Sequence, residues 1–469
     1  MLGLRQAKTV AAADAARMNS KAAHDETNCD GNGFDSHRSR RYVIFLEAYI
    51  MPGTSDGARS VAMARLSSCY GSGVDQILGA KIVNVQGQTQ TADEELLVGI
   101  RGGGGSLGII TELTIKVYSL DKQQTILITG VSGHIGFRVL TKALADGYRV
   151  RAVLRKESQI AKIQAVASIQ PYLSQLELVL IPDVTVPSAF DAVVDGLWAI
   201  IHVASPTFSG FGEVNVSEFC SASWRVTQSV LHFAAKTPSV KRVVITSSIS
   251  AIIPFFDTEQ HDSPDFYTNK SPIRVDGIES WPDHAPENVA YVLSKIFVAD
   301  CVRKYVQSTQ LKVHFSVVNV LPGTTVGPNE LASNPRELLA GSNMVAIGPL
   351  LGAKFAPIPS IVSHVDDVAF AHLKALYVDT SPGEISSLLP VYNSKADPTP
   401  FKWDDAVKIV QEEFPEATKC GIFPFGGTVP VVRLLADSTE DEKMLGRRFK
   451  GYREAVIDVV RQYLKLAAK

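Results

Sequence analysis

A tyrosine and a lysine four residues apart form the pair whose spacing points most directly to chemistry. Tyr291 and Lys295 lie in a segment with apolar residues at helical intervals, and residues four apart share one face of a helix. A phenol ionises only near pH 10, whereas a neighbouring ammonium favours the phenolate and makes the group an efficient general acid. Taken alone, the pair is equally explained as a surface helix pair.

A serine that follows a strand-like run supplies a third polar group. Ser248 closes the sequence Thr246-Ser247-Ser248, which directly follows the apolar residues 243–245. Its hydroxyl could donate a hydrogen bond to a substrate carbonyl and stabilise developing oxyanion charge. A plain loop serine is the simpler alternative. In this chain order, Ser248, Tyr291 and Lys295 together predict a proton-delivery site for carbonyl reduction.

A glycine-rich turn lies upstream of these residues, between a predicted strand and a predicted helix. Gly130 permits a tight turn, Gly133 lets the backbone approach a pyrophosphate, and Gly136 allows close packing of helix on strand. The N-terminus of the helix would direct free N–H groups at the phosphates. A simple strand-to-helix turn is the alternative. The residues predicted to contact a dinucleotide here are Thr129, Gly130, Gly133, His134, Ile135 and Gly136. We expect the His134 side chain to face solvent or phosphate.

The choice of dinucleotide is predicted from the end of the second strand. That strand ends in Arg155-Lys156, with no acidic residue before Glu157. An acidic residue at this place binds the ribose 2′-hydroxyl of NAD, whereas a guanidinium suits the 2′-phosphate of NADP. We therefore predict NADPH, with a solvated charge pair as the alternative. Asp183, followed by Val184, is expected to meet the adenine edge or to cap the next helix.

Alternating strand and helix patterns from residue 125 onward predict the fold class, an α/β protein with a doubly wound parallel Rossmann sheet. The helix after the glycine turn carries Phe137, Leu140 and Leu144 at helical spacing and is expected to end at Gly147. The predicted strands, nearly continuous apolar runs, are 125–129, 149–154, 176–181, 199–204, 242–246 and 313–320.

The bulk composition excludes several classes of protein. The formal net charge of −2 gives nucleic-acid binding no electrostatic support. The five cysteines show no metal-ligand or disulfide pattern, which predicts no metal site and fits a reducing, cytoplasmic compartment. Organelle import is a minor alternative, because residues 1–21 are rich in alanine and basic residues. No apolar run approaches the roughly 18 residues of a membrane span.

Several motifs in fixed order resemble the extended short-chain dehydrogenase/reductases, nearest to the dihydroflavonol reductase, cinnamoyl-CoA reductase and fungal aldehyde/methylglyoxal reductase group. They are TGVSGHIG (129–136), VLRK (153–156), PDV (182–184), HVASP (202–206), VKRVVITSS (240–248), YVLSK (291–295), LPGTTVGP (321–328) and HVDDVAFAH (364–372). The resemblance covers residues 125–469. The segment around Trp224 lacks the small, glycine-bearing face expected of relatives, which leaves the substrate fit in doubt.

This resemblance implies roles for individual residues. Tyr291 would donate the proton, Lys295 would tune Tyr291 and bind the nicotinamide ribose, and Ser248 would orient the carbonyl. Arg155 would bind the 2′-phosphate and the segment 254–287 would lie over the substrate. The remaining cofactor contacts implied are Val203, Ala204 and Ser205, and Pro322 and Thr325 near the carboxamide.

The function predicted from this resemblance is NADPH-dependent reduction of a ketone or aldehyde to an alcohol, in secondary metabolism or aldehyde detoxification. The alternatives are an NAD-dependent hydroxysteroid dehydrogenase or epimerase-type enzyme of the same superfamily, a catalytically silent NADP-binding module, and a bifunctional flavin/nicotinamide protein. We expect a small-molecule carbonyl substrate, no nucleic-acid or membrane partner, and a monomer or homodimer.

A second resemblance concerns residues 70–120. AKIVNVQG (80–87) and IRGGGGSLGIITELTIKVYSL (100–120) resemble the flavin domain of berberine-bridge-type FAD-linked oxidases. The upstream phosphate loop of that family is not recognisable, so we do not expect FAD to bind. The domain organisation predicted is a disordered segment at 1–40, a truncated α+β flavin-oxidase-like fragment at 41–121, and an NADP-binding reductase at 122–469. Its small substrate-binding lobe would begin near residue 328.

Overall fold

The structure, a computed structural model, describes most of the chain from residue 124 onward and parts of what precedes it. The described residues are 42–43, 77–84, 86–103, 109–115, 118–119, 124–186, 188–206, 212–253, 266–273, 275, 280–308, 312–396 and 401–468. The predicted disorder of residues 1–40 concerns a segment outside this set.

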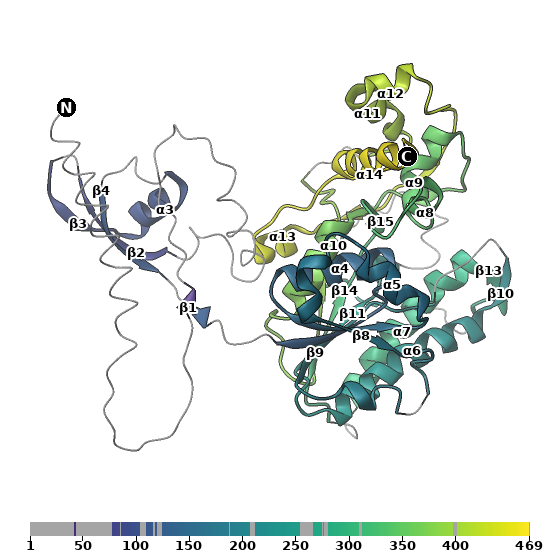
Figure 1. Cartoon of the computed structure of the whole chain (residues 1–469), viewed down its shortest axis with the longest axis horizontal. Coiled ribbons are helices and arrows are strands. Elements are labelled where there is room, and N and C mark those ends of the chain that lie inside the picture. Colours follow the sequence, from purple (N-terminus) through teal and green to yellow (C-terminus); the bar gives the residue numbers. More distant parts are fainter. Residues whose placement is uncertain are drawn as a thin grey trace. The chain divides into compact units, whose positions relative to one another are not determined.

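A parallel sheet of seven strands is the centre of the described chain (Figure 1). The order across the sheet is β18-β14-β11-β9-β6-β7-β8, and every neighbouring pair is parallel. The strands are β6 (Thr125–Thr129), β7 (Arg149–Leu154), β8 (Leu176–Leu180), β9 (Leu197–His202), β11 (Arg242–Thr246), β14 (Ser316–Val320) and β18 (Ile385–Leu388).

The predicted fold class is confirmed by this sheet. Three strands coincide with their predicted bounds, and three others are shifted or shortened at an end. The seventh strand, β18, was not predicted, because its sequence Ile385-Ser386-Ser387-Leu388 lacks an apolar run. It joins the sheet through parallel pairing with β14, in which Val317 faces Ile385.

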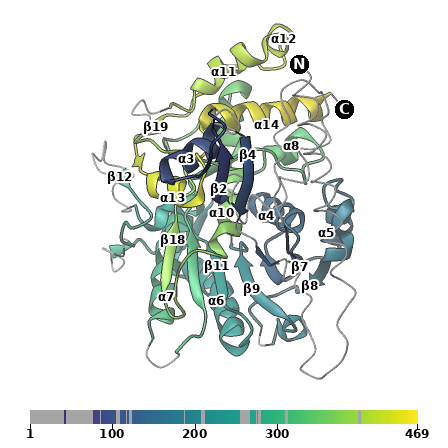
Figure 2. The same ribbon diagram turned by 90° about the vertical axis from the view of Figure 1, so that its left-hand side faces the viewer.

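Helices cover both faces of the sheet (Figure 2). In β6, Ile126 and Ile128 belong to one core and Leu127 to the other, as the two-residue period of a strand requires. Burial of both faces explains why most strands are continuously apolar. The first face packs against α4 (His134–Ala145), α5 (Ser158–Gln164) and α10 (Val365–Ala375), and the second against α6 (Val216–Lys236) and α7 (Glu287–Val306).

The connections reverse direction at the middle of the sheet. The chain leaves β6 toward β7 and β8 on one side, and later returns to β9 on the other side of β6. The connections that follow β6 and β9 therefore run in opposite directions across the sheet, so the carboxyl ends of these two strands are its topological switch point. Ligands of doubly wound sheets bind at such a topological switch point.

The C-terminal part of the chain forms a lobe with its own core, at the top of Figure 1. Its centre is Trp403, whose ring lies edge-on to that of Tyr452 at 5.1 Å between centroids. The Tyr452 hydroxyl donates to the Trp403 carbonyl at 2.7 Å. The elements of the lobe are β15 (Thr324–Val326), α8 (Pro335–Leu338), α9 (Asn343–Ile347), β17 (Val362–His364), α11 (Asp405–Glu413), α12 (Pro415–Lys419) and α14 (Tyr452–Ala467).

Short strand pairs complete the part of the chain after residue 124. They are β10 (Glu213–Asn215) with β13 (His284–Pro286), β12 (Phe266–Tyr267) with β20 (Leu435–Ala436), and β16 (Ile358–Pro359) with β19 (Val431–Val432). The helix α13 (Thr439–Leu445) follows β20. In the part of the chain that the structure describes, no helix has the length and apolar character to cross a bilayer.

The front of the chain contains a small antiparallel sheet, described here by itself. Its order is β3-β2-β4, and Ala80, Ile82, Leu97 and Ile100 form a core between β2 and the helix α3. The elements are β2 (Ile77–Val83), β3 (Thr89–Thr91), α3 (Glu94–Gly103) and β4 (Ile109–Ile115), with a separate pair of β1 (Tyr42–Val43) and β5 (Tyr118–Ser119). Strands and a helix thus occur in this segment, as expected of an α+β fragment.

A cluster of charges joins α4 to the lobe. The Arg138 guanidinium donates to Asp366 at 2.6 Å and to Glu330 at 3.0 Å, and Lys450 donates to the second oxygen of Asp366 at 3.2 Å. Burial alone would raise the pKa of Asp366, but the adjacent Arg138 outweighs it and holds that pKa well below its usual value. Arg138 therefore fastens the helix that starts at the glycine turn to the residues after β15.

We expect Arg138→Met to lower the free energy of unfolding by about 1.5–3 kcal/mol, because two hydrogen bonds to carboxylates are lost in a partly buried place. Urea unfolding measures the change. Lys162→Met is the matched control, since the Lys162–Glu337 pair is nearly half exposed and should contribute less than about 1 kcal/mol. Equal losses in the two variants would contradict the role assigned to Arg138.

Candidate active site

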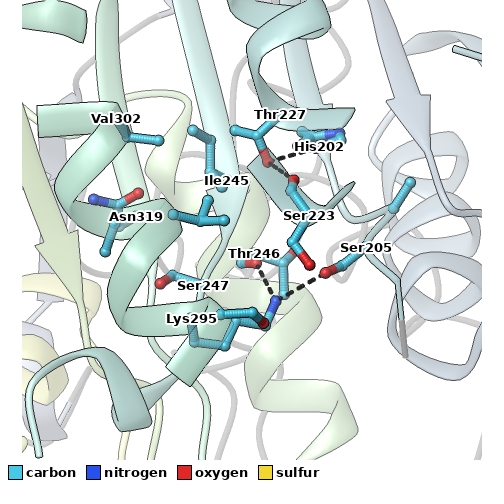
Figure 3. Close-up of a pocket in the computed structure, with 14 residues that line it drawn as sticks. His202, Ser205, Ser223, Thr227, Ile245, Thr246, Ser247, Lys295, Val302 and Asn319 are labelled. Carbon is cyan, nitrogen blue, oxygen red and sulfur yellow. Dashed lines mark hydrogen bonds between the residues drawn. The ribbon is translucent and has the colours of Figure 1, made fainter. Parts of the chain in front are cut away.

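Lys295 lies at the centre of the site that the sequence predicted. It is on α7, its side chain is buried with 7% of the residue exposed, and its ammonium is drawn in Figure 3. The ammonium donates to the Ser205 hydroxyl at 3.3 Å and to the Thr246 carbonyl at 3.4 Å. It also lies 5.3 Å from the ring centroid of Tyr291, one helical turn earlier. A single ammonium thus contacts the segments after β9 and at the end of β11, and the predicted acid.

Ser248 follows β11, and α7 packs against the short 3-10 helix 249–251 that comes next. Its hydroxyl accepts a hydrogen bond from the Ser250 amide at 3.1 Å and donates to the Ser250 hydroxyl at 3.1 Å. The Ile249 amide donates to the Pro322 carbonyl at 3.0 Å. The 3-10 helix that begins after Ser248 therefore contacts both α7 and the segment after β14.

The glycine turn has a geometry that admits no side chain at two of its three glycines. Gly130 has φ of +77°, and a Cβ there would lie 2.6 Å from the Ala204 nitrogen and 2.9 Å from the Val203 carbonyl carbon. A Cβ at Gly136 would overlap the Gly130 carbonyl. A Cβ at Gly133 would meet only the Gly130 oxygen, at 3.4 Å.

The start of α4 suits a phosphate. Gly133 is the N-cap, no side chain caps the helix, and its first turn contains no acidic residue. Free N–H groups and the positive end of the helix dipole are available for an anion. This donor set and the glycine surface fit the pyrophosphate of a dinucleotide. At the other end of the helix, Gly147 has φ of +91° and donates to Leu144, which confirms the predicted helix end.

Two predicted contacts on the turn have side chains directed elsewhere. The Thr129 hydroxyl is buried and accepts from the Ala204 amide at 3.2 Å, beside His202. The His134 ring bonds to the Pro328 carbonyl at 3.0 Å, and burial lowers its pKa. The expectation that this ring faces solvent or phosphate is thus corrected: it contacts the segment after β15. Ile135 is partly buried and packs against the core that includes α4.

Arg155 and Lys156 are exposed at the end of β7. Their amides bond to the Gln159 side chain, and within the described residues neither side chain forms an ion pair. Arg151, earlier in the strand, is instead bound to Glu177 and to the carbonyls of Val193 and Asp195. Of these basic residues, Arg151 is therefore engaged in hydrogen bonds within the protein.

The third strand and the segment after β14 hold the other predicted contacts. The Asp183 carboxylate accepts from the hydroxyl and the amide of Thr185, which lowers its pKa, and Val184 is buried beside it. Thr325 is buried in β15 and donates to the Gly323 carbonyl at 3.2 Å. Part of the segment 254–287, predicted to lie over the substrate, is outside the described residues.

A small cavity of about 10 Å³, lined by polar and apolar residues, lies beside Lys295 (Figure 3). His202, Ser223, Thr227, Ser247 and Asn319 line it, together with the lysine. A volume of this size is at the lower limit for one water molecule. None of these five residues was predicted from the sequence as part of the site. The signal that could have found two of them is a polar residue within an apolar strand, as in Ile200-Ile201-His202 and Val318-Asn319-Val320.

A doubly wound parallel sheet with a glycine turn at its switch point defines a dinucleotide-binding α/β enzyme. The model of the NAD dependent epimerase/dehydratase family matches residues 126–385, and the chain belongs to this family. Because the match begins at residue 126, it lends no support to the flavin-domain resemblance of residues 70–120.

Several named relatives are similar to this chain over about three quarters of its length. The NAD-dependent epimerase/dehydratase ALT6 of Alternaria alternata is 32% identical over 361 residues, which cover 74% of this chain and 99% of that protein. The ketoreductase CTB6 of Cercospora beticola is 32% identical over 354 residues, covering 73% and 96%. The solved structure of yeast methylglyoxal/isovaleraldehyde reductase Gre2 complexed with NADPH has a TM-score of 0.60 at 20% identity, covering 73% and 99%. Family and relatives together support an NAD(P)-dependent oxidoreductase.

Three buried histidines predict how stability depends on pH. Burial lowers the pKa of His202 to about 3 and those of His364 and His372 to about 4. Below about pH 6.5 the unfolded chain binds protons that the folded protein does not. Stability should therefore be full above pH 6.5 and fall as the pH drops toward 4, by about 1.4 kcal/mol per histidine and pH unit at most. Asp441, whose pKa is raised to about 6 by burial, and Asp367, whose pKa burial also raises, oppose this trend.

Urea midpoints at pH 7.5, 6 and 5 measure this dependence. His372→Gln should flatten it, whereas His232→Asn, a change at an exposed histidine, should leave it unchanged. A midpoint that stays constant or rises from pH 7.5 to pH 5 would contradict the neutral state of the buried rings.

Proposed function

We propose that this protein reduces a ketone or aldehyde to an alcohol with NADPH, and that Tyr291 donates the proton. The observation that carries the proposal is the buried Lys295 ammonium, which lies beside the Tyr291 ring and is bound to Ser205 and Thr246 at the switch point of the sheet. The ketoreductase and reductase names of relatives support the same reaction class. Carbonyl reduction requires both an acid and an oxyanion donor at this edge of the sheet.

The chain's own residues divide the work as follows. When bound, the nicotinamide supplies the hydride. The Ser248 hydroxyl, which donates to Ser250 in the structure, would turn its proton to the carbonyl oxygen of a bound substrate and stabilise the charge that develops there. Tyr291 gives its hydroxyl proton to that oxygen. Lys295 stabilises the phenolate left behind, because its charge is desolvated and close to the ring. It also presents its ammonium toward the ribose.

The cofactor contacts that we propose are those expected from the glycine turn and from the family resemblance. The backbone of the turn from Gly130 to Gly136 and the start of α4 would bind the pyrophosphate, and Val203, Ala204 and Ser205 would form the facing wall. Pro322 and Thr325 would lie at the carboxamide, and Asp183 with Val184 at the adenine. The exposed Arg155 would bind the 2′-phosphate through a forked hydrogen bond, with Lys156 adding charge.

An NAD-dependent epimerase-type reaction is the second candidate, favoured by the relative ALT6, which is named an NAD-dependent epimerase/dehydratase. The two candidates differ in the cofactor that the protein prefers and in whether it is consumed. Net oxidation of NADPH with a carbonyl substrate supports reduction. Conversion of a substrate with tightly held NAD and no net change in cofactor would support the alternative.

Tyr291→Phe should lower kcat by about 10²–10⁴, because the proton donor is removed, while the Kd of NADPH changes less than about threefold. The assay is NADPH oxidation against a panel of aldehydes, ketones and flavanone-type substrates, with cofactor binding followed by fluorescence. Tyr463→Phe, in the core of the lobe, is the matched control. Wild-type turnover in Tyr291→Phe would show that another group donates the proton.

Arg155→Ala should raise KM for NADPH about 10–100-fold, the loss expected for a hydrogen bond to a charged group, and change KM for NADH less than about threefold. Arg149→Ala is the control, since Arg149 is an exposed arginine at the opposite end of the same strand. Equal effects on NADPH and NADH would refute the assignment of the 2′-phosphate to Arg155.

A further inference from the structure

His202 ends β9 at the switch point, and its ring lies between β6 and α6. The residue is 2% exposed. Its Nδ1 lies 2.8 Å from the Thr129 hydroxyl and its Nε2 lies 3.4 Å from the Thr227 hydroxyl. Figure 3 shows the ring beside Thr227, and both residues line the same cavity as Lys295. The buried ring therefore contacts both β6 and α6.

The neighbours of the two threonines favour one direction for these hydrogen bonds. The Thr227 hydroxyl lies 3.4 Å from both the Ser223 carbonyl and the His202 Nε2. A threonine in a helix commonly donates to the carbonyl four residues earlier, and with its proton on Ser223 the Thr227 oxygen accepts from a protonated Nε2. A neutral ring then has an unprotonated Nδ1, which accepts the Thr129 proton. The Thr129 oxygen in turn accepts from the Ala204 amide at 3.2 Å. With this tautomer each hydrogen bond in the chain from the Ala204 amide through Thr129, the His202 ring and Thr227 to the Ser223 carbonyl has one donor and one acceptor.

The ring is held in its neutral form by its surroundings. Burial, and then the positive charge of Lys295, lower the pKa of His202 to about 3. A second ring proton would also meet the Thr129 hydroxyl, whose own proton points at Nδ1 in this arrangement. The groups facing the ring are Thr129 from β6, Thr227 from α6 and Lys295 from α7.

We propose that His202, as its neutral Nε2–H tautomer, is a positioning residue that fixes the segment Val203–Ser205 against the glycine turn. The proposal rests on the proposed function in that this segment forms one wall of the cofactor site. His202 acts through Thr129, which holds the Ala204 amide, and it does not touch the reacting atoms.

The position of the segment Val203–Ser205 matters because it makes close contacts with both the glycine turn and Lys295. Gly130 approaches Val203 and Ala204 so closely that even a methyl group would not fit between them. One residue further on, the Ser205 hydroxyl is one of the two hydrogen-bond partners of the Lys295 ammonium. A shift of the segment would therefore change both the width of the crevice and the position of the lysine.

Thr129 offers a matched pair of variants for the test. Thr129→Val keeps the shape and removes the hydroxyl, and Thr129→Ser keeps the hydroxyl. We expect Thr129→Val to raise the Kd of NADPH about tenfold and to lower kcat by a similar factor, and Thr129→Ser to restore both to within about threefold. Thr237→Val is the control for a lost buried hydroxyl, since the Thr237 hydroxyl bonds to Phe233 at the far end of α6. Wild-type values in Thr129→Val, or the same losses in Thr237→Val, would overturn the proposal.

The tautomer is measured without cofactor or substrate. In protein labelled with ¹⁵N-histidine, the His202 signals, assigned by their loss in His202→Gln, should show a neutral ring protonated at Nε2 from pH 8 to pH 5. A ring protonated at Nδ1, or a charged ring at pH 6, would overturn the proposal even if NADPH binds. If the wild type binds neither NADPH nor NADH, the proposed function fails, and the tautomer measurement still decides the state of His202.

Discussion

The buried ammonium of Lys295 is the interaction on which the site depends. A desolvated charge is costly unless it is paired or hydrogen-bonded, and here the partners come from separate parts of the sheet. Ser205 follows β9, Thr246 ends β11, and the Tyr291 ring is one turn away on the same helix. The lysine can be satisfied only when β9 and β11 are paired in the observed register, in which Ile245 faces His202. Pairing of β9 with β11 therefore also brings together the hydrogen-bond partners of Lys295.

The crevice beside the lysine is formed by backbone more than by side chains. Gly130 lies against Val203 and Ala204, and Gly136 lies against Gly130, so the turn and the facing wall are in direct contact. Two side chains of the turn form hydrogen bonds with neighbouring segments. Thr129 bonds to the Ala204 amide, and His134 bonds to Pro328. A surface of N–H groups and glycine Cα atoms is left for a dinucleotide, which explains how a smooth turn can approach a pyrophosphate closely.

The sequence was sufficient for those features that depend on local pattern. Apolar runs located six of the strands of the main sheet, and the spacing of Phe137, Leu140 and Leu144 located α4. Features that depend on pairing between distant segments were missed. Thr129 and His202 are 73 residues apart, and His134 and Pro328 are 194 apart, so no local pattern reveals that these side chains meet. The strand β18 was missed for a related reason, since its place in the sheet is set by pairing with β14 and not by an apolar sequence.

Polar residues within apolar strands mark the parts of the site that local pattern overlooked. A buried polar group without a partner is costly, so a sequence that retains one inside a strand must provide its partner elsewhere. His202 meets Thr129 and Thr227, and Thr246 meets His372 at 2.7 Å. Thr129, His202 and Thr246 lie at the carboxyl ends of β6, β9 and β11, where ligands of parallel sheets bind. Ser248 follows the same edge of the sheet, and Lys295 bonds to Thr246 there. The buried polar residues therefore lie next to the candidate site, and the glycine turn lies at the neighbouring strand. A chain in which only Tyr291 and Lys295 were matched would lack this support, which is why the pair gains its meaning from the strands around it.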